Sequence, residues 1–236
     1  MTYNCLKHKN IPDSLSCFLN QTDREYIEAA SALPLFDIGK TAQWSAFQKT
    51  SFAAIFYHIR GHFINFMWYM ANFSTDSGTK ELILDNISEE LGTENKFSHE
   101  SLYQRFALEC GVDINQEILD EQHYLDFVKK FNKGHIQWLS AHDSDDHIAA
   151  FSAYERLDNI DYPFLTELAS SIGISSSGMT FFRVHMQAEH FSAALKQLVP
   201  VWESTPDKVK QAFHFINSHQ LNMWKQLSET IFALEA

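Results

Sequence analysis

The segment from Thr41 to about Phe73 constrains the fold more than any other part of the sequence. It contains the run WSAFQKTSFAAIFYHIRGHFINFMWYMANF, which is apolar around most of its circumference if it forms a helix. A helix that is hydrophobic on all sides is normally buried among other elements. Gly61, inside the run, costs roughly 1 kcal/mol relative to alanine in a helix and permits close packing. We therefore expect a central helix here, surrounded by others.

The rest of the chain also predicts helices. Only 8 glycines and 5 prolines interrupt the 236 residues, and no stretch shows the two-residue alternation of a strand. Ser98 and either Asp145 or Asp146 are candidate N-caps, while Gly92 and Gly111 are candidate stops. The other expected helices are 14–33, 80–91, 99–110, 115–140, 148–157, 161–173, 178–199 and 206–233. The sequence predicts an all-α protein with seven to nine helices.

A single domain is the simplest organisation of this chain. Hydrophobic residues make up 45% of the sequence, enough for a sizeable core, and no repeat, low-complexity run or flexible linker divides it. We expect one helical bundle over residues 1–236, with an N-terminal helix in about 1–40 and the core bundle in 41–233.

Charge and cysteine content exclude several classes of protein. The net charge is −12 with histidine counted as neutral, which disfavours nucleic acid or an anionic membrane surface as a partner. The three cysteines include no Cys-x-x-Cys pair, so they predict neither a disulfide framework nor a zinc ribbon. The N-terminus lacks an apolar signal-peptide core, and no stretch reaches 18 uninterrupted apolar residues. We expect a cytoplasmic protein, for which a homodimer is one allowed state.

Five polar residues on separate segments have the types and spacings of a non-haem metal site: Glu90, His99, Glu155, His185 and Glu189. Carboxylates with imidazoles suit iron or manganese, and di-iron bundle proteins project such ligands inward from several helices. Ordinary explanations exist as well. His185 and Glu189 share a helix face and could form a simple hydrogen bond, and Glu90 could be a solvated residue. Glu155 lies in the mostly apolar run IAAFSAYERL and needs a partner if it is buried, which a metal ion would provide.

Three motifs surround these residues in a fixed order. NISEELG followed by HESLYQRFALECGV is similar to NLxxExG, a spacer and HxxLFxxFxxxLG; AYERLDNIDYP and FFRVHMQAEHF are similar to a second carboxylate segment and to FFxxHxxxD. Together they resemble the haem-oxygenase-like di-iron oxidases and oxygenases, over roughly residues 45 to 195. The resemblance implies a seven-helix up-and-down bundle of the haem-oxygenase type that binds no haem and activates O2 at iron.

The resemblance also assigns ligands residue by residue. The family's ligands match Glu90, His99, Glu155 and His185, and its aspartate ligand matches Glu189. The family usually has a histidine three residues after that aspartate, where this chain has Ser192, a poor ligand for iron. The second metal position would then need another donor, for which His62 is a candidate.

Two further residues are candidates for chemistry. In relatives that form para-aminobenzoate, a tyrosine at the place of Tyr154 takes part in the reaction, so Tyr154 is a candidate catalytic residue, with core packing as the alternative. Cys110 is a candidate nucleophile by analogy with thiaminase-like relatives of the same fold. No base motif accompanies Cys110, which favours a small buried residue instead.

These observations predict a non-haem iron-dependent oxidase or oxygenase that uses O2 to oxidise a small organic substrate. One or two Fe(II) ions, or Mn in their place, would be the cofactor. Two alternatives stay open. The first is a cofactor-independent enzyme of the same fold, thiaminase-like or quinone-cofactor-synthesis-like. The second is a non-catalytic helical protein that presents an interaction surface.

Overall fold

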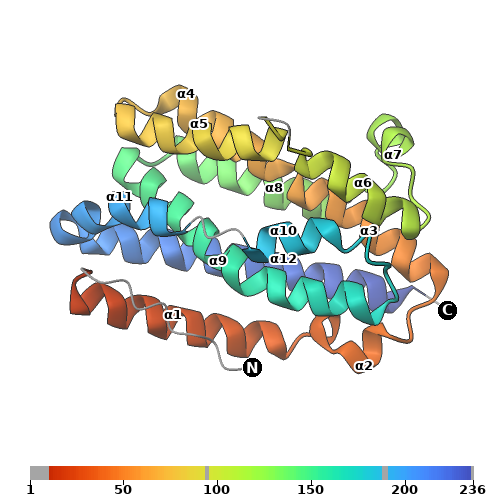
Figure 1. Cartoon of the computed structure of the whole chain (residues 1–236). Coiled ribbons are helices and arrows are strands. Elements are labelled where there is room, and N and C mark those ends of the chain that lie inside the picture. The colour runs from red at the N-terminus through yellow and green to blue at the C-terminus, as the bar shows by residue number, and fades with distance from the viewer. Residues whose placement is uncertain (1–10, 94–95, 188–190, 235–236) are drawn as a thin grey trace.

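A computed structural model describes residues 11–93, 96–187 and 191–234, and all regular secondary structure in these ranges is helical. Most of the long helices lie side by side along one direction, with α1 on one outer side and α4 and α5 on the opposite side (Figure 1). The elements are α1 (Asp13–Ser31), η1 (Pro34–Phe36), α2 (Ile38–Thr41), α3 (Ala46–Arg60), α4 (His62–Phe73), α5 (Ser77–Leu91), α6 (His99–Glu109), α7 (Ile114–Asp120), α8 (Asp126–Ser140), α9 (Ser144–Ser171), α10 (Thr180–Gln187), α11 (Phe191–Ser204) and α12 (Pro206–Ala233).

The central element is α9, which packs against α10, α11 and α12. Buried side chains follow one another along it from Asp146 to Leu157 without a break. A helix buried on all sides belongs at the centre of a bundle. The prediction of an all-α protein is confirmed, but its centre lies in α9 rather than in the segment 41–73.

The segment 41–73 forms two helices instead of one. Gly61 ends α3 by donating its backbone N–H to the carbonyl oxygen of Tyr57 at 3.0 Å, and α4 begins at His62. Glycine has the weakest helix propensity after proline, which makes this the natural place for a break. The segment is also less buried than its composition predicts, since Phe47 and Phe73 are 58% and 64% exposed.

Other differences follow from packing and turn geometry. We expected Asp161-Tyr162-Pro163 and Pro200 to interrupt helices, yet α9 and α11 continue through Pro163 and Pro200. The cost of an internal proline, about 3 kcal/mol, is outweighed where both ends of a helix are held by neighbours. The range 115–140 instead divides into α7 and α8 at Glu121, whose φ of 48° is left-handed. The number of helices therefore exceeds the seven to nine expected.

Helix caps were more predictable. Ser98 caps α6 by accepting from the backbone nitrogen of Ser101 at 3.1 Å, as expected. The cap of α9 is Asp143 rather than Asp145 or Asp146, because its side chain accepts from both of their backbone nitrogens. Asp146 in turn accepts from the Asp143 backbone nitrogen, which completes a capping box.

Polar contacts attach α1 to the centre of the bundle. The Tyr26 hydroxyl donates to Asp161 on α9 at 2.9 Å, and Arg156 on α9 donates to Asp23 through two nitrogens. Within the described ranges, no helix combines the length and hydropathy needed to cross a membrane.

Candidate metal centre

The end of α5 and the start of α6 bring Glu90 and His99 together. Glu90 is the next-to-last residue of α5, and His99 is the first of α6. Gly92 ends α5 with a φ of 68°, in the left-handed region, and any Cβ there would clash with the backbone of Phe97 and Ser98. The chain therefore folds back closely enough for His99 Nδ1 to lie 2.7 Å from Glu90 Oε1.

His185 on α10 completes a cluster with these two residues. Its Nε2 lies 3.9 Å from Glu90 Oε1, and its ring centroid lies 4.3 Å from that of His99. One donor atom from each of the three residues lies within 4.8 Å of the other two. Both imidazoles are buried. Glu90, His99 and His185 are referred to below as the Glu–His–His triad.

The surroundings of His185 fix which of its nitrogens faces the triad. Its Nδ1 lies 2.9 Å from the carbonyl oxygen of Phe181, which can only accept a hydrogen bond. We therefore assign the proton to Nδ1, which leaves the lone pair of Nε2 directed towards Glu90. The ring of Tyr162 stacks on His185 at 4.1 Å with an interplanar angle of 15°. This arrangement, with one nitrogen held by a backbone carbonyl and the other left open, is typical of metal-binding histidines.

Burial and hydrogen bonding set the charges in the triad. Burial raises the pKa of Glu90, but the hydrogen bond from His99 and the nearby His99, His185 and Arg60 outweigh it and lower that pKa to about 2. Burial, with His99 adding to it, lowers the pKa of His185 to about 3. At neutral pH the triad therefore contains an ionised carboxylate and a neutral His185 imidazole, which are the forms that bind metal ions.

The triad fits a metal ion in both geometry and chemistry. With bonds of about 2.0–2.2 Å, two ligands of one ion lie roughly 3 Å apart when adjacent and about 4.3 Å apart when opposite. The separations of 2.7 and 3.9 Å from Glu90 Oε1 are close to these values. Imidazole and carboxylate donors together suit iron or manganese. The three side chains could therefore hold one such ion with little rearrangement.

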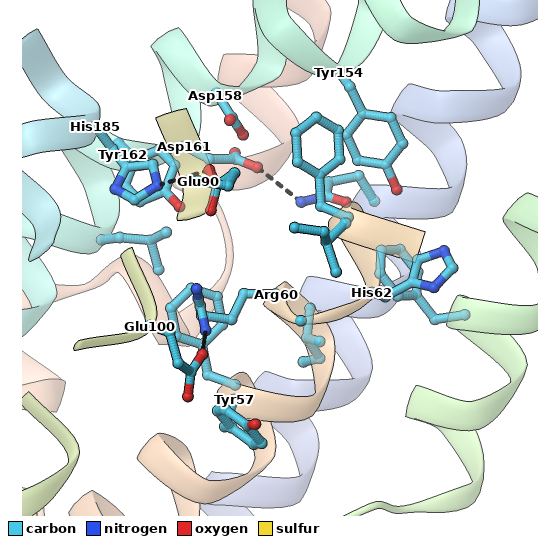
Figure 2. Close-up of a pocket in the computed structure, with 18 of the residues that line it drawn as sticks. Tyr57, Arg60, His62, Glu90, Glu100, Tyr154, Asp158, Asp161, Tyr162 and His185 are labelled. Atoms are coloured by element: carbon cyan, nitrogen blue, oxygen red, sulfur yellow. Dashed lines mark hydrogen bonds and ion pairs between the residues drawn. The ribbon is translucent and has the colours of Figure 1, made fainter. Parts of the chain in front are cut away.

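A cavity of about 490 Å³ lies beside the triad. This volume is in the range of small-molecule sites. Glu90 and His185 lie at one side of it in Figure 2, where their polar atoms face the interior. Seven of the other lining residues are aromatic: Phe56, Tyr57, Phe63, Phe131, Tyr154, Tyr162 and Trp224. A small, largely apolar molecule could occupy this space and reach the triad.

The remaining predicted ligands do not join the triad in the described part of the chain. Glu155 lies on α9 and is only 2% exposed, but neither of its oxygens lies within 4.8 Å of all three donor atoms of the triad. Glu189 lies outside the described residues, and Ser192 is half-buried near the start of α11. Glu90, His99 and His185 thus lie together, and the roles of these three residues, Glu155 and Glu189 as ligands stay predictions.

His62 and Tyr154 lie on the opposite side of the cavity from Glu90 and His185 (Figure 2). The His62 ring stacks on His135 with a centroid distance of 5.1 Å, and the Tyr154 hydroxyl is hydrogen-bonded to His135. Both side chains also line the cavity. This placement does not support His62 as an additional ligand beside the triad. It leaves Tyr154 in contact with the cavity but on its far wall.

Sequence reasoning missed Arg60, a buried cation in the cavity wall. Its guanidinium donates to Glu100 at 3.0 Å and lies over the rings of Tyr103 and Phe181, at 4.7 and 5.1 Å from their centroids. These contacts hold it rigidly beside the cavity. Its last-turn position on α3, directly before Gly61, gave no signal of this role.

Two aspartates in the cavity wall were also missed. Asp158 lies near Glu90 and Asp161 in Figure 2, and burial, with the charges of Asp161 and Glu90, raises its pKa well above the usual value. Asp161 accepts hydrogen bonds from Tyr26, Gln220 and Trp224. Burial still raises its pKa to about 6, against the lowering effect of these donors. The available signal was helical spacing, since Asp158 follows Glu155 by about one turn.

Comparisons with known proteins identify a family and a fold for this chain. A family model described as iron-containing redox enzyme matches residues 50–224. No curated protein is similar enough in sequence to count as a match.

Solved structures with the same fold include a CADD-like protein of unknown function from Nostoc punctiforme PCC 73102, in two crystal structures. It is 16% identical, with TM-scores of 0.68 and 0.69, and the matches cover 93% and 92% of this chain and 98% and 100% of that chain. Another is a domain of unknown function with a haem-oxygenase-like fold from Shewanella denitrificans OS217, 15% identical, with a TM-score of 0.71 and coverage of 92% and 91%. At these identities the likeness shows the fold alone. Because the family model spans most of the chain, this protein belongs to the iron-containing redox enzyme family, on a haem-oxygenase-like fold.

Proposed function

We propose that this family member is an O2-dependent oxidase or oxygenase that binds ferrous iron at the Glu–His–His triad and oxidises a small organic substrate. The observation that carries the proposal is the position of the triad beside an aromatic-lined cavity of about 490 Å³. A metal site without such a cavity would serve structure, and a cavity without donors would serve binding. The combination supports chemistry on a bound molecule.

Each side chain has a distinct part in this proposal. Iron, when bound, supplies the electrons that activate O2. Glu90 would contribute the negative charge and His99 and His185 imidazole nitrogens, while Phe181 and Tyr162 hold the His185 ring in place. The aromatic walls exclude water from the substrate and limit its orientations. Arg60, fixed by Glu100, adds a positive charge to the wall.

The alternative functions have less support. A thiaminase-like mechanism needs a reactive thiolate, but Cys110 is 5% exposed and burial, assisted by Glu109, raises its pKa to about 12. A thiol in this state is a poor nucleophile. A protein that only presents an interaction surface does not need a cavity lined by Glu90 and His185, two possible metal ligands.

Anaerobic loading with Fe(II) tests the proposal. After desalting, metal analysis should find at least one iron per chain, and mixing with O2 in a stopped-flow spectrometer should give an absorbance transient that metal-free protein lacks. Mn(II) competition reports selectivity, and Cys110→Ala should behave as the wild type does. If iron is not retained and O2 causes no change, the cofactor-independent alternative is favoured instead.

A further inference from the structure

Three residues of the cavity wall have a buried polar atom with no hydrogen-bond partner among the described residues. One is Oε1 of the half-buried Glu100, whose other oxygen accepts from Arg60. The other two belong to fully buried residues and are Nε2 of His62 on α4 and Oε1 of Gln220 on α12. The two residues are 5% and 8% exposed, and both line the cavity. Leaving a buried polar atom unpaired costs about 1–3 kcal/mol. Such atoms therefore mark places where a molecule in the cavity supplies the missing partner.

The orientation of Gln220 is fixed by Asp161. Gln220 Nε2 donates to Asp161 Oδ2 at 3.1 Å, and an ionised carboxylate accepts hydrogen bonds but cannot donate them. The amide nitrogen must therefore face Asp161, which leaves Oε1 as the open atom. Oε1 can only accept, so the partner it lacks is a hydrogen-bond donor. Asp161 itself already accepts from Tyr26 and Trp224, each at 2.9 Å.

His62 offers a neutral partner in the same part of the molecule. Burial, with His219 adding to it, lowers the pKa of His62 to about 4, so the ring is uncharged at neutral pH. His219 directly precedes Gln220 and stacks on Phe131 at 4.9 Å, and Phe131 contacts the His62 ring edge to face at 6.4 Å. Phe131 therefore contacts both α4 and α12, and it lines the same cavity as His62 and Gln220. A neutral imidazole nitrogen can accept or donate, depending on its tautomer.

We propose that the substrate carries an alcohol or phenol hydroxyl that donates to Gln220 Oε1 and takes the His62 imidazole as its second hydrogen-bonding partner. Calling this molecule the substrate rests on the proposed function. The hydrogen-bonding site itself does not require the metal. The His62 side of this site lies across the cavity from Glu90 and His185 (Figure 2). The apolar remainder of the molecule then extends towards the triad along the aromatic walls.

Charged groups fit this place less well. A carboxylate would face the acceptor oxygen of Gln220 and the charge of Asp161 behind it, and it would be repelled. An ammonium group would be drawn to a carboxylate with free acceptor capacity. Asp161 is occupied by three donors, and the charge of Glu100, whose Oε1 is open, is paired with Arg60 at 3.0 Å. An uncharged hydroxyl satisfies both open atoms without moving a charge out of water.

The test uses matched probes that differ by one group: 4-propylphenol, propylbenzene, 4-propylbenzoate and 4-ethylbenzylamine. Their dissociation constants are measured by ligand-observed NMR on the full chain, both metal-free and loaded with Fe(II). The variants are Gln220→Met and His62→Phe. Gln226→Met, on the same helix but outside the cavity wall, and His142→Phe are the matched controls. Thermal unfolding checks that each variant is folded.

We expect the preference for 4-propylphenol over propylbenzene to fall roughly threefold to tenfold in each cavity variant and to stay constant in the controls, since one neutral hydrogen bond contributes about 0.5–1.5 kcal/mol. Iron stoichiometry should not change. If Gln220→Met fails to fold, the preference for 4-propylphenol measured in His62→Phe still tests the inference. Equal preference in wild type and variants overturns the inference, as does tighter binding of the benzoate or the amine. Loss of iron binding with the phenol preference intact would instead contradict the proposed function alone.

Discussion

Two groups of buried or half-buried imidazoles each place one ring in the wall of the same cavity, His185 in the first group and His62 in the second. They differ in whether a carboxylate is present. In the Glu–His–His triad, His99 is hydrogen-bonded to Glu90 and the donor atoms converge within 4.8 Å. The second group, His62, His135 and His219, is referred to below as the histidine cluster. Its rings pack against one another, His62 on His135 at 5.1 Å and His135 on His219 edge to face at 4.5 Å. Among the described residues, only the triad meets the distance criterion for a metal site.

The difference teaches what a carboxylate adds to buried histidines. Without a negative charge nearby, burial lowers the pKa of all three members of the histidine cluster. They stay neutral and pack as aromatic rings. His219 is hydrogen-bonded to the Phe131 carbonyl oxygen at 2.9 Å and His135 to the Tyr154 hydroxyl, whereas Nε2 of His62 has no partner among the described residues. In the triad the ionised Glu90 offsets part of the charge of a cation, which a buried site requires. Three histidines near a cavity are therefore not equivalent to two histidines and a glutamate.

The strongest test of this comparison replaces one histidine of each group with alanine. His185→Ala should lower iron affinity more than 100-fold, because it removes a ligand rather than a neighbour of one. His135→Ala should leave the iron stoichiometry near that of the wild type. Metal analysis after anaerobic loading measures both. Iron loss in His135→Ala with retention in His185→Ala would mean that the two groups have been assigned in reverse.

Glu155→Ala asks whether the triad has a fourth member. If Glu155 binds the metal, the variant should lose more than about 100-fold in iron affinity, as expected for His185→Ala, and about 10- to 100-fold if Glu155 only supports a ligand. The metal-free protein should be as stable as the wild type or more so, because fewer like charges face one another. Glu167→Ala, at an exposed position of α9, is the control. A steep fall in the unfolding temperature of metal-free Glu155→Ala, with iron still bound, would show that Glu155 is structural.

Local signals in the sequence account for the part of the site that was predicted. Gly92 and Ser98 mark the end of α5 and the start of α6, and the short turn between them pairs Glu90 with His99. The motif around His185 then supplied the third member through resemblance. Each of these inferences depends on a few neighbouring residues or on a motif whose order is known.

The unpredicted parts depend on tertiary packing. Nothing near Gln220 in the sequence indicates that its amide faces Asp161, since that contact joins α9 to α12. The histidine cluster draws on α4, α8 and α12, and no spacing relates His62 to His135. The same holds for Pro163, which local rules treat as a helix boundary but which packing retains inside α9. Fold class was therefore predictable, while the identity of the central helix and the far wall of the cavity was not.

The histidine cluster should also appear in the pH dependence of stability. The pKa of His62 is lowered in the folded state to about 4 from 6.5, so the unfolded chain takes up a proton first as the pH falls. Stability is therefore complete above about pH 6.5 and is lost towards pH 4. Between pH 7 and pH 5 this group should remove about 2 kcal/mol from the free energy of unfolding.

His62→Phe should abolish that contribution, which denaturant unfolding at the two pH values can measure. The raised pKa of Asp161 acts in the opposite direction, but it is present in both proteins and cancels in the difference. His142→Phe, a half-buried ring outside the cluster, is the control. Equal pH dependence in wild type and His62→Phe would show that His62 is not held neutral by burial.

The smallest expected effect concerns a second metal ion. The related family has a histidine where this chain has Ser192, one turn after Glu189, which lies outside the described residues. A metal position that lacks a nitrogen donor keeps more water ligands and binds less tightly. We therefore expect one firmly bound iron at the triad and a second that is weak or absent. Ser192→His should raise the stoichiometry by up to one iron per chain, as measured by titration and Mössbauer spectroscopy.

His62 is the alternative donor, although its place in the histidine cluster disfavours it. If the wild type binds two irons equally tightly and His62→Ala loses one of them, His62 is a metal ligand. Both groups of histidines would then bind metal.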